Sequence, residues 1–156
     1  MSLATDSIFV TALQSNSELL EKLTEYIDDD GNIQYDETPR LYGTAIRLPD
    51  EEADNVPVPY VIVTYNGMTN DVESKDAGME GSEDTVQIGL ELTASSLKTL
   101  HELASKVRVE VREYMETGGH AEAPIEYTLS SGPISYDAAK PCYWMVLNYS
   151  CVTNAE

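Results

Sequence analysis

The stretch from Thr85 to Met115 limits the possible folds more than any other, because its hydrophobic period changes once along its length. In residues 86–93 the apolar side chains take every second position, which is the period of a strand with one buried face. From Leu97 onward the apolar residues are three or four positions apart, so they share one helical face. These residues are Leu97, Leu100, Ala104, Val107, Val111 and Tyr114. The stretch therefore predicts one strand followed directly by one long amphipathic helix.

The ends of this helix are also predicted by the sequence. Ser95 and Ser96 stand where the period changes, and a serine hydroxyl can cap the free amides of a first helical turn. Two glycines, residues 118–119, are expected to end the helix, since glycine takes the left-handed C-terminal geometry without steric penalty. The apolar stripes of strand and helix are expected to bury each other. The contact predicted to form the core joins Leu100, Ala104, Val107 and Val111 to Ile88, Leu90 and Leu92.

The rest of the chain predicts a single α+β domain over residues 1–156. Residues 6–27 are expected to be helical, and the capping-box spacing of Ser15 and Glu18 favours two short helices over one. Residues 60–65 are apolar on both alternating faces, which predicts a strand covered on both sides or packed against another chain. Further strands are predicted at residues 40–43, 125–129 and 143–152. The expected architecture is an antiparallel or mixed sheet of about four to five strands with helices packed on one face.

Two connecting segments are rich in polar residues and glycine. Ser130 to Lys140 is predicted to be a turn region. Asn66 to Asp84 is predicted to be a long loop, with two interpretations: the tip of a hairpin that reaches a partner, or an acidic loop without a role. Under the first interpretation the partner-binding residues are Tyr65, Met68, Asp71 and Met79, the methionines being suited to irregular surfaces.

The net charge of −19, from 28 acidic and 9 basic residues, argues against binding nucleic acid through phosphates. A generic solvated acidic surface is the plainer interpretation of the same charge.

No apolar run approaches the ~20 residues of a membrane span, and the N-terminus lacks the pattern of a secretory signal. We therefore expect no membrane contact and a protein that acts inside a cell. Cys142 and Cys151 would lie about 30 Å apart in one strand, so both are expected to be buried thiols.

Sequence motifs for catalysis, cofactors or metals are weak. His101 and His120, the only histidines, have no spacing to cysteines or acids that suggests zinc. With Gly31 in the sixth position of a calcium loop, Asp28, Asp30 and Glu37 fall on ligand positions, but Tyr26 takes the first one and offers no carboxylate. We expect an acidic turn without tight calcium binding, no cofactor and no enzymatic activity. A small calcium-binding or enzymatic module remains an alternative.

Ten tyrosines against one phenylalanine and one tryptophan favour contact surfaces, because a tyrosine can bury its ring and still form a hydrogen bond. Half-buried tyrosines at the ends of strands are an equally good explanation.

Four stretches carry a resemblance to a known family. They are Ile8–Leu23, Arg40–Tyr42 followed by Pro59–Val63, Val86–Leu92 leading to Leu103–Arg108, and Trp144–Cys151. Their order and spacing resemble the tail terminator, or tail completion, proteins of long-tailed bacteriophages and prophages. The resemblance implies a structural protein that forms a ring, usually of six subunits, on the end of the tail tube. It also implies contacts with the tail tube protein and the head–tail connector, assembly in the bacterial cytoplasm and a final place in the virion tail. The alternative is an acidic DNA mimic that inhibits a DNA-binding protein, which the same charge would suit.

Overall fold

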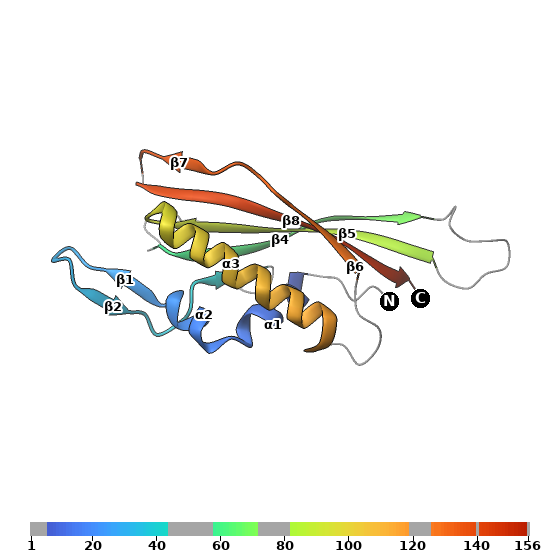
Figure 1. Ribbon diagram of the computed structural model, residues 1–156, viewed down its shortest axis with the longest axis horizontal. Coiled ribbons are helices and arrows are strands. Elements are labelled where there is room, and N and C mark those ends of the chain that lie inside the picture. Colours follow the sequence, from blue (N-terminus) through green and yellow to red (C-terminus); the bar gives the residue numbers. More distant parts are fainter. Residues whose placement is uncertain (1–5, 44–57, 72–81, 119–125, 140, 156) are drawn as a thin grey trace.

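The computed structural model of the protein describes residues 6–43, 58–71, 82–118, 126–139 and 141–155 (Figure 1). In chain order the elements are α1 (Asp6–Gln14), α2 (Ser17–Lys22), β1 (Glu25–Ile27), β2 (Ile33–Tyr35), β3 (Leu41–Tyr42), β4 (Tyr60–Asp71), β5 (Ser82–Ala94), α3 (Leu97–Glu113), the π-helical turn η2 (Tyr114–Gly118), β6 (Glu126–Ser131), β7 (Ser135–Asp137) and β8 (Cys142–Ala155). The predicted α+β class is confirmed, with α1, α2 and α3 on one face of the main sheet (Figure 1).

The main sheet is mixed and has six strands. Its order is β3-β4-β5-β8-β6, and β7 also pairs with β8. Only the β3–β4 pair is parallel among the described strands. Two more strands, β1 and β2, form a separate antiparallel hairpin. The described strands therefore exceed the four to five expected, because the strands at residues 25–27, 33–35 and 135–137 have three residues each, too few for alternation alone to identify them.

The predicted strand–helix unit is confirmed as β5 followed by α3. Ser96 is the N-cap of α3, and its hydroxyl accepts a hydrogen bond from the backbone N–H of Thr99 at 3.1 Å. All seven residues expected to form the contact lie in one buried cluster. Leu97 is an exception to the predicted helical stripe, since 44% of it is exposed. As the first helical residue, it points back past the N-terminal end of the helix, and the buried Leu103 belongs to the apolar face instead.

The N-terminal region forms two short helices, α1 and α2, as the sequence favours. The predicted capping box at Ser15 is wrong, however, because the N-cap of α2 is Asn16. The Asn16 side chain accepts from the Leu19 N–H at 3.0 Å, whereas the Ser15 hydroxyl donates to the Ala12 carbonyl. The Asn16 amide also donates to the Glu110 carboxylate at 2.6 Å. The same side chain therefore caps α2 and fastens the junction of α1 and α2 to α3.

The predicted long loop from Asn66 to Asp84 is wrong over most of the part that the structure describes. The β4–β5 ladder continues from Met68 opposite Val86 to Asp71 opposite Glu83. Such a ladder is built from backbone hydrogen bonds, which polar residues make as well as apolar ones. A bulge lies between Tyr65 and Gly67, where glycine supplies a φ of +122°.

The acidic segment after α2 also differs from expectation. A calcium loop requires a helix directly before it, but the strand β1 occupies that place, and Asp28 to Asn32 form the turn of the β1–β2 hairpin. One Asp28 carboxylate oxygen accepts from the N–H groups of Asp30 and Asn32 at 3.0 and 2.9 Å. The hydrogen bond from Asn32 is the main cause that lowers the pKa of Asp28. This carboxylate therefore organises the turn.

Candidate interaction surfaces

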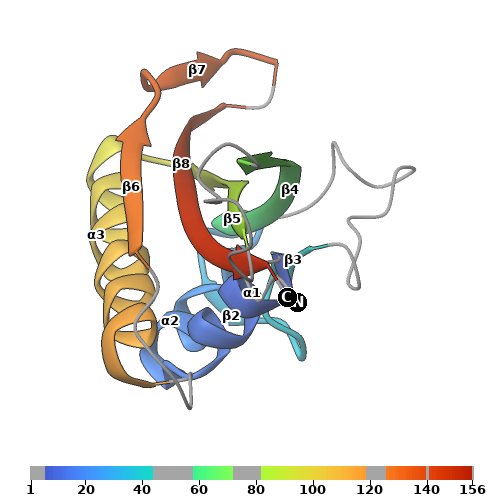
Figure 2. The same cartoon turned by 90° about the vertical axis from the view of Figure 1, so that its right-hand side faces the viewer.

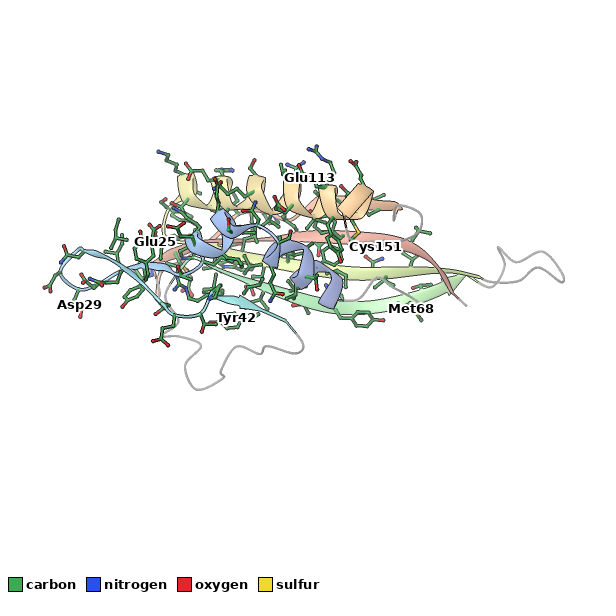
Figure 3. All side chains as sticks on the ribbon, turned by 90° about the horizontal axis from the view of Figure 1, so that it is seen from below. Glu25, Asp29, Tyr42, Met68, Glu113 and Cys151 are labelled. Carbon is green, nitrogen blue, oxygen red and sulfur yellow. The ribbon has the colours of Figure 1, made fainter. Side chains whose placement is uncertain are left out.

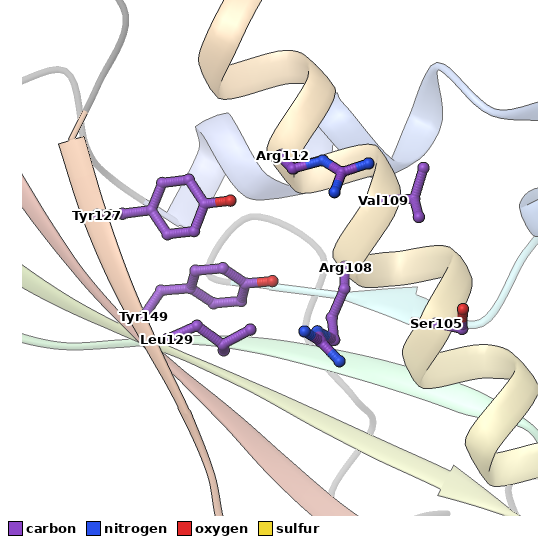
Figure 4. Close-up of a pocket in the computed structure, with 7 residues that line it drawn as sticks. All are labelled: Ser105, Arg108, Val109, Arg112, Tyr127, Leu129 and Tyr149. Atoms are coloured by element: carbon purple, nitrogen blue, oxygen red, sulfur yellow. The ribbon is translucent and has the colours of Figure 1, made fainter.

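A groove runs along the surface between α3 and the edge strand β6, and we call it the α3–β6 groove (Figure 4). On the helix side its exposed residues are His101, Ser105, Arg108, Val109 and Arg112. All but Val109 are spaced four, three and four positions apart and therefore lie on one flank. On the strand side it is lined by Tyr127, Leu129 and Ile134. Two adjoining pockets of about 260 and 480 Å³ make up the groove and share Ser105, Arg108 and Leu129. Figure 2 shows α3 lying beside β6 along the twisted sheet.

The groove has an apolar floor and a positively charged side. Among the described residues that line it, Arg108 and Arg112 are charged and none is acidic. Tyr149 forms part of the wall, and its ring packs against Phe9 with the centroids 5.2 Å apart. The buried Tyr149 hydroxyl has no hydrogen-bond partner within the described part of the chain. Burial raises the pKa of this hydroxyl, which stays protonated as a hydrogen-bond donor. An unpaired buried hydroxyl is costly, so a water or an acceptor group that reached it would stabilise the protein.

The second surface is the β1–β2 hairpin, residues 25–35, which we call the hairpin arm. Figure 1 shows it projecting from one end of the molecule. Ile27 and Ile33 face each other across the two strands, and Tyr35 lies two positions further on the same face. Their exposed fractions are 67%, 55% and 59%. Three large apolar side chains on one face of a thin hairpin form a surface suited to contact with another molecule.

Arg40 fixes the base of the hairpin arm. Arg40 is 3% exposed, and its guanidinium group donates to the Pro59 carbonyl at 3.0 Å, to the Thr24 carbonyl at 3.2 Å and to the Glu25 carbonyl. It also forms an ion pair with Asp36 at 2.5 Å. Burial lowers the pKa of Arg40, and the Asp36 carboxylate opposes that effect. One side chain therefore joins the end of α2, both sides of the hairpin arm and the start of β4.

A third surface is the face of the sheet opposite the helices, which none of the three described helices covers. Tyr60, Ile62, Trp144 and Val146 are half-buried on it. Glu91 lies between Ile62 and Val146 in the strand pairing. The strand at residues 60–65 thus has one buried face, with Val61 and Val63 in the core, and one half-buried face. Desolvation raises the pKa of Glu91.

This pKa predicts how Glu91 affects stability. A carboxyl whose pKa is raised by folding favours the folded state when protonated, and that stability is lost as the pH rises from the ordinary value of 4.5 through the folded-state pKa. We therefore expect Glu91→Gln to be more stable than the parent at pH 7 and equal to it well below pH 4.5. Thermal melts across pH measure this, with the exposed Glu102→Gln as control. An advantage that persists at acid pH would contradict the assignment.

Tyr65 and Met68, the two predicted partner-binding residues whose side chains the structure describes, lie neither in the groove nor on the hairpin arm. Tyr65 and Met68 are 44% and 50% exposed and lie on the helix-facing side of β4, opposite Ile88 and Val86. Figure 3 shows Met68 near the end of the molecule opposite Asp29 of the hairpin turn. Asp71 is the last residue of β4, with its side chain outside the described part, and Met79 lies outside the described residues. That these four residues bind a partner stays a prediction.

The surface residues that sequence reasoning missed carried a detectable signal. Ile33 and Tyr35 alternate directly after Gly31, whose φ is +83°, and such alternation beside a glycine turn is typical of a hairpin. Arg108 and Arg112 are one helical turn apart in a chain with few basic residues. The partners of each feature, however, come from distant segments of the chain.

The described part of the protein gives little support for a metal site, a membrane-spanning helix or a reactive thiol. No group of three or more histidine, cysteine or acidic residues there could hold a metal ion. None of its helices is long and apolar enough to cross a membrane. Cys142 and Cys151 are buried thiols, as predicted. Burial raises the pKa of Cys151 to about 11, so its thiol is protonated at neutral pH and unreactive.

Comparison with known proteins finds similarity in structure alone. The sequence matches no protein-family profile and no curated protein. The fold, however, is similar to that of a chain in the virion of a native gene transfer agent (GTA) particle, with a TM-score of 0.53 and 10% sequence identity. The match covers 97% of this chain and 96% of that one. The protein therefore shares, over nearly its whole length, the fold of a component of a virion.

Proposed function

We propose that this protein is a structural component of a phage-like particle and acts as its tail terminator. In this proposal the subunits form a ring, six to a ring, on the end of the tail tube, and the ring provides the surface that joins the head–tail connector. The observation that carries it is the fold shared with a chain of a gene transfer agent virion over almost the full length of both chains. The order of elements that resembles tail terminator proteins agrees with it.

The surfaces of the protein suit assembly into a ring. The hairpin arm and the α3–β6 groove lie in different places on one subunit, as a head-to-tail contact requires. The sheet face opposite the helices offers a further half-buried apolar area for a neighbouring subunit or the tube. The protein has no enzymatic step in this proposal.

The acidity of the chain suits a ring through which DNA passes. With 28 acidic and 9 basic residues, the wall of the ring would repel the DNA phosphates. The repulsion acts over roughly a Debye length, ~10 Å, so it keeps the DNA from adhering without closing the opening.

Deletion of the gene from the phage or prophage that carries it tests the function. We expect tails of abnormal length, or normal tails without heads, in electron micrographs, and loss of infectious particles. The matched control restores the intact gene from a plasmid and should recover joined particles. Normal infectious particles from the deletion strain would rule the proposal out.

A further inference from the structure

We propose that the hairpin arm of one subunit docks into the α3–β6 groove of a second copy of this chain. The inference deepens the proposed function, on which it rests for the closure of copies into a ring. The contact itself is argued from the two surfaces. Neither the shared fold nor the resemblance indicates which faces of the subunit meet.

The apolar surfaces of the arm and the groove complement each other. A two-stranded hairpin is marginally stable in water, and here it exposes Ile27, Ile33 and Tyr35 on one face. The groove presents Tyr127, Leu129 and Ile134 beside hollows of about 260 and 480 Å³. A hairpin face placed there would cover its apolar side chains and fill these hollows with them. Both surfaces would then lose exposed apolar area in one contact.

The charges of the two surfaces are opposite. Glu25, Asp28, Asp29, Asp30, Asp36 and Glu37 lie in or next to the hairpin arm. Two basic residues flank the arm in the sequence, Lys22 and Arg40, and Arg40 is buried in hydrogen bonds at the base of the arm. Four of the nine basic residues of the chain lie on α3, and Arg108 and Arg112 of these line the groove. In a chain so short of positive charge, a groove lined by two arginines and no acid is suited to receive an acidic arm.

The Tyr149 hydroxyl adds to the groove wall a hydrogen-bond donor that suits a segment of polypeptide. It is a buried donor without a partner within the described residues, on the wall of the pocket that also contains Arg108 and Arg112 (Figure 4). An incoming strand carries a carbonyl oxygen at every residue, and an acidic one adds carboxylate oxygens. Either oxygen can accept the bond that the subunit leaves unmade.

The arrangement of the two surfaces favours contact between copies over contact within one chain. Figure 1 shows the hairpin arm directed away from the body of its own subunit, beyond the helices. An arm that leaves one subunit and enters the groove of the next makes a head-to-tail contact. Repeated with a rotation that closes, such a contact builds a ring.

Photo-crosslinking tests the contact directly. Benzoylphenylalanine placed at Tyr35 keeps an aromatic ring at an exposed position. In a mixture of isotopically light and heavy chains, we expect crosslinks from position 35 to residues 101–112 or 127–134 of the other copy. Mass spectrometry of the linked peptides distinguishes contacts between copies from contacts within one. Crosslinks confined to one chain, directed to another region or to a different protein, or absent between copies would overturn the proposal.

Mixing of charge variants tests whether the contact is head-to-tail. Arg108→Glu with Arg112→Glu should abolish self-association in sedimentation experiments, and so should Ile33→Asp with Tyr35→Asp. The two variants mixed should form pairs and no larger species, because one intact arm then meets one intact groove. The matched control, Lys98→Glu with Lys106→Glu, changes the same charge on the same helix outside the groove and should associate like the parent. Failure of the mixture to pair would overturn the proposal.

The results also separate this inference from the proposed function. Rings that form normally with both variants would reject the arm–groove contact and leave the tail-terminator role standing. Crosslinks between arm and groove, in a protein whose deletion leaves infectious particles normal, would support the contact and reject the role.

Discussion

Replacing Leu100 by alanine is expected to lower the free energy of unfolding by about 2–5 kcal/mol. Leu100 is fully buried in α3, within the cluster that also contains Ile88, Leu90 and Leu92 of β5. Removing most of its side chain deletes contacts on both layers and leaves a cavity, because close-packed surroundings relax only in part. The loss is large against the total stability of about 5–15 kcal/mol usual for a folded domain. Denaturant unfolding of parent and variant measures the difference.

Leu97 offers a matched control for this substitution. It is the same residue type on the same helix, one turn earlier, and 44% of it is exposed. Leu97→Ala removes the same atoms from a position that packs little, so the expected change is within about 0.5 kcal/mol. Equal effects of the two substitutions would mean that the face of α3 toward the sheet has been assigned wrongly.

The central strand–helix unit could be predicted because its hydrophobic pattern is both long and regular. Alternation over residues 86–93 and helical spacing from Leu100 to Val111 each repeat several times, and a repeated pattern fixes the period and the buried face. The strand predicted at residues 143–152 is the greater part of β8, in which the buried Met145, Leu147 and Tyr149 also alternate. Elements that bury one face in the main core are the elements that sequence periodicity can identify.

The elements that could not be predicted are those that depend on backbone pairing. Residues from Met68 to Asp71 belong to β4 because a long neighbour, β5, offers hydrogen bonds along its whole length. In the same way β7 forms against the first residues of β8. Neither segment needs an apolar pattern in order to pair, so hydrophobic periodicity does not identify either one. Strand limits at the edges of a sheet are consequently set by tertiary structure more than by local sequence.

The interaction surfaces depend on tertiary structure even more strongly. The α3–β6 groove forms because β6 pairs with β8 and thereby comes to lie beside α3. Arg108 and Leu129, which share the groove, are distant in the sequence, and nothing local to either indicates the other. In the sequence, methionines in a polar segment are the clearest indication of a partner-binding surface, and they lead to the prediction of Met68. The exposed apolar face of the hairpin arm becomes apparent only once its strand pairing is known.

Replacing Arg40 by methionine is expected to destabilise the protein by about 3 kcal/mol. Methionine keeps much of the length of the side chain but donates no hydrogen bond. The carbonyl oxygens of Thr24, Glu25 and Pro59 would lose their bonds to the guanidinium, although Thr24 keeps the bond from the Asp36 N–H. The Pro59 carbonyl is the buried one, and a buried acceptor left unpaired costs about 1–3 kcal/mol. Asp36 is 39% exposed, so its carboxylate can be hydrated and adds less. Arg40→Lys should recover only part of the loss, since one ammonium group cannot reproduce the planar set of donors.

The same substitution is expected to release the hairpin arm before the rest of the domain unfolds. Arg40 joins the base of the arm to the end of α2 and the start of β4, while the arm itself exposes most of its large apolar side chains. Amide hydrogen exchange should therefore quicken in β1 and β2 more than in β5 or β8. Lys98→Met, at an exposed basic residue of α3 outside the groove, is the matched control and should change neither stability nor exchange in the arm. If the arm remains as protected in Arg40→Met as in the parent, its rigidity comes from another contact, and the docking arm that we propose is not positioned by Arg40.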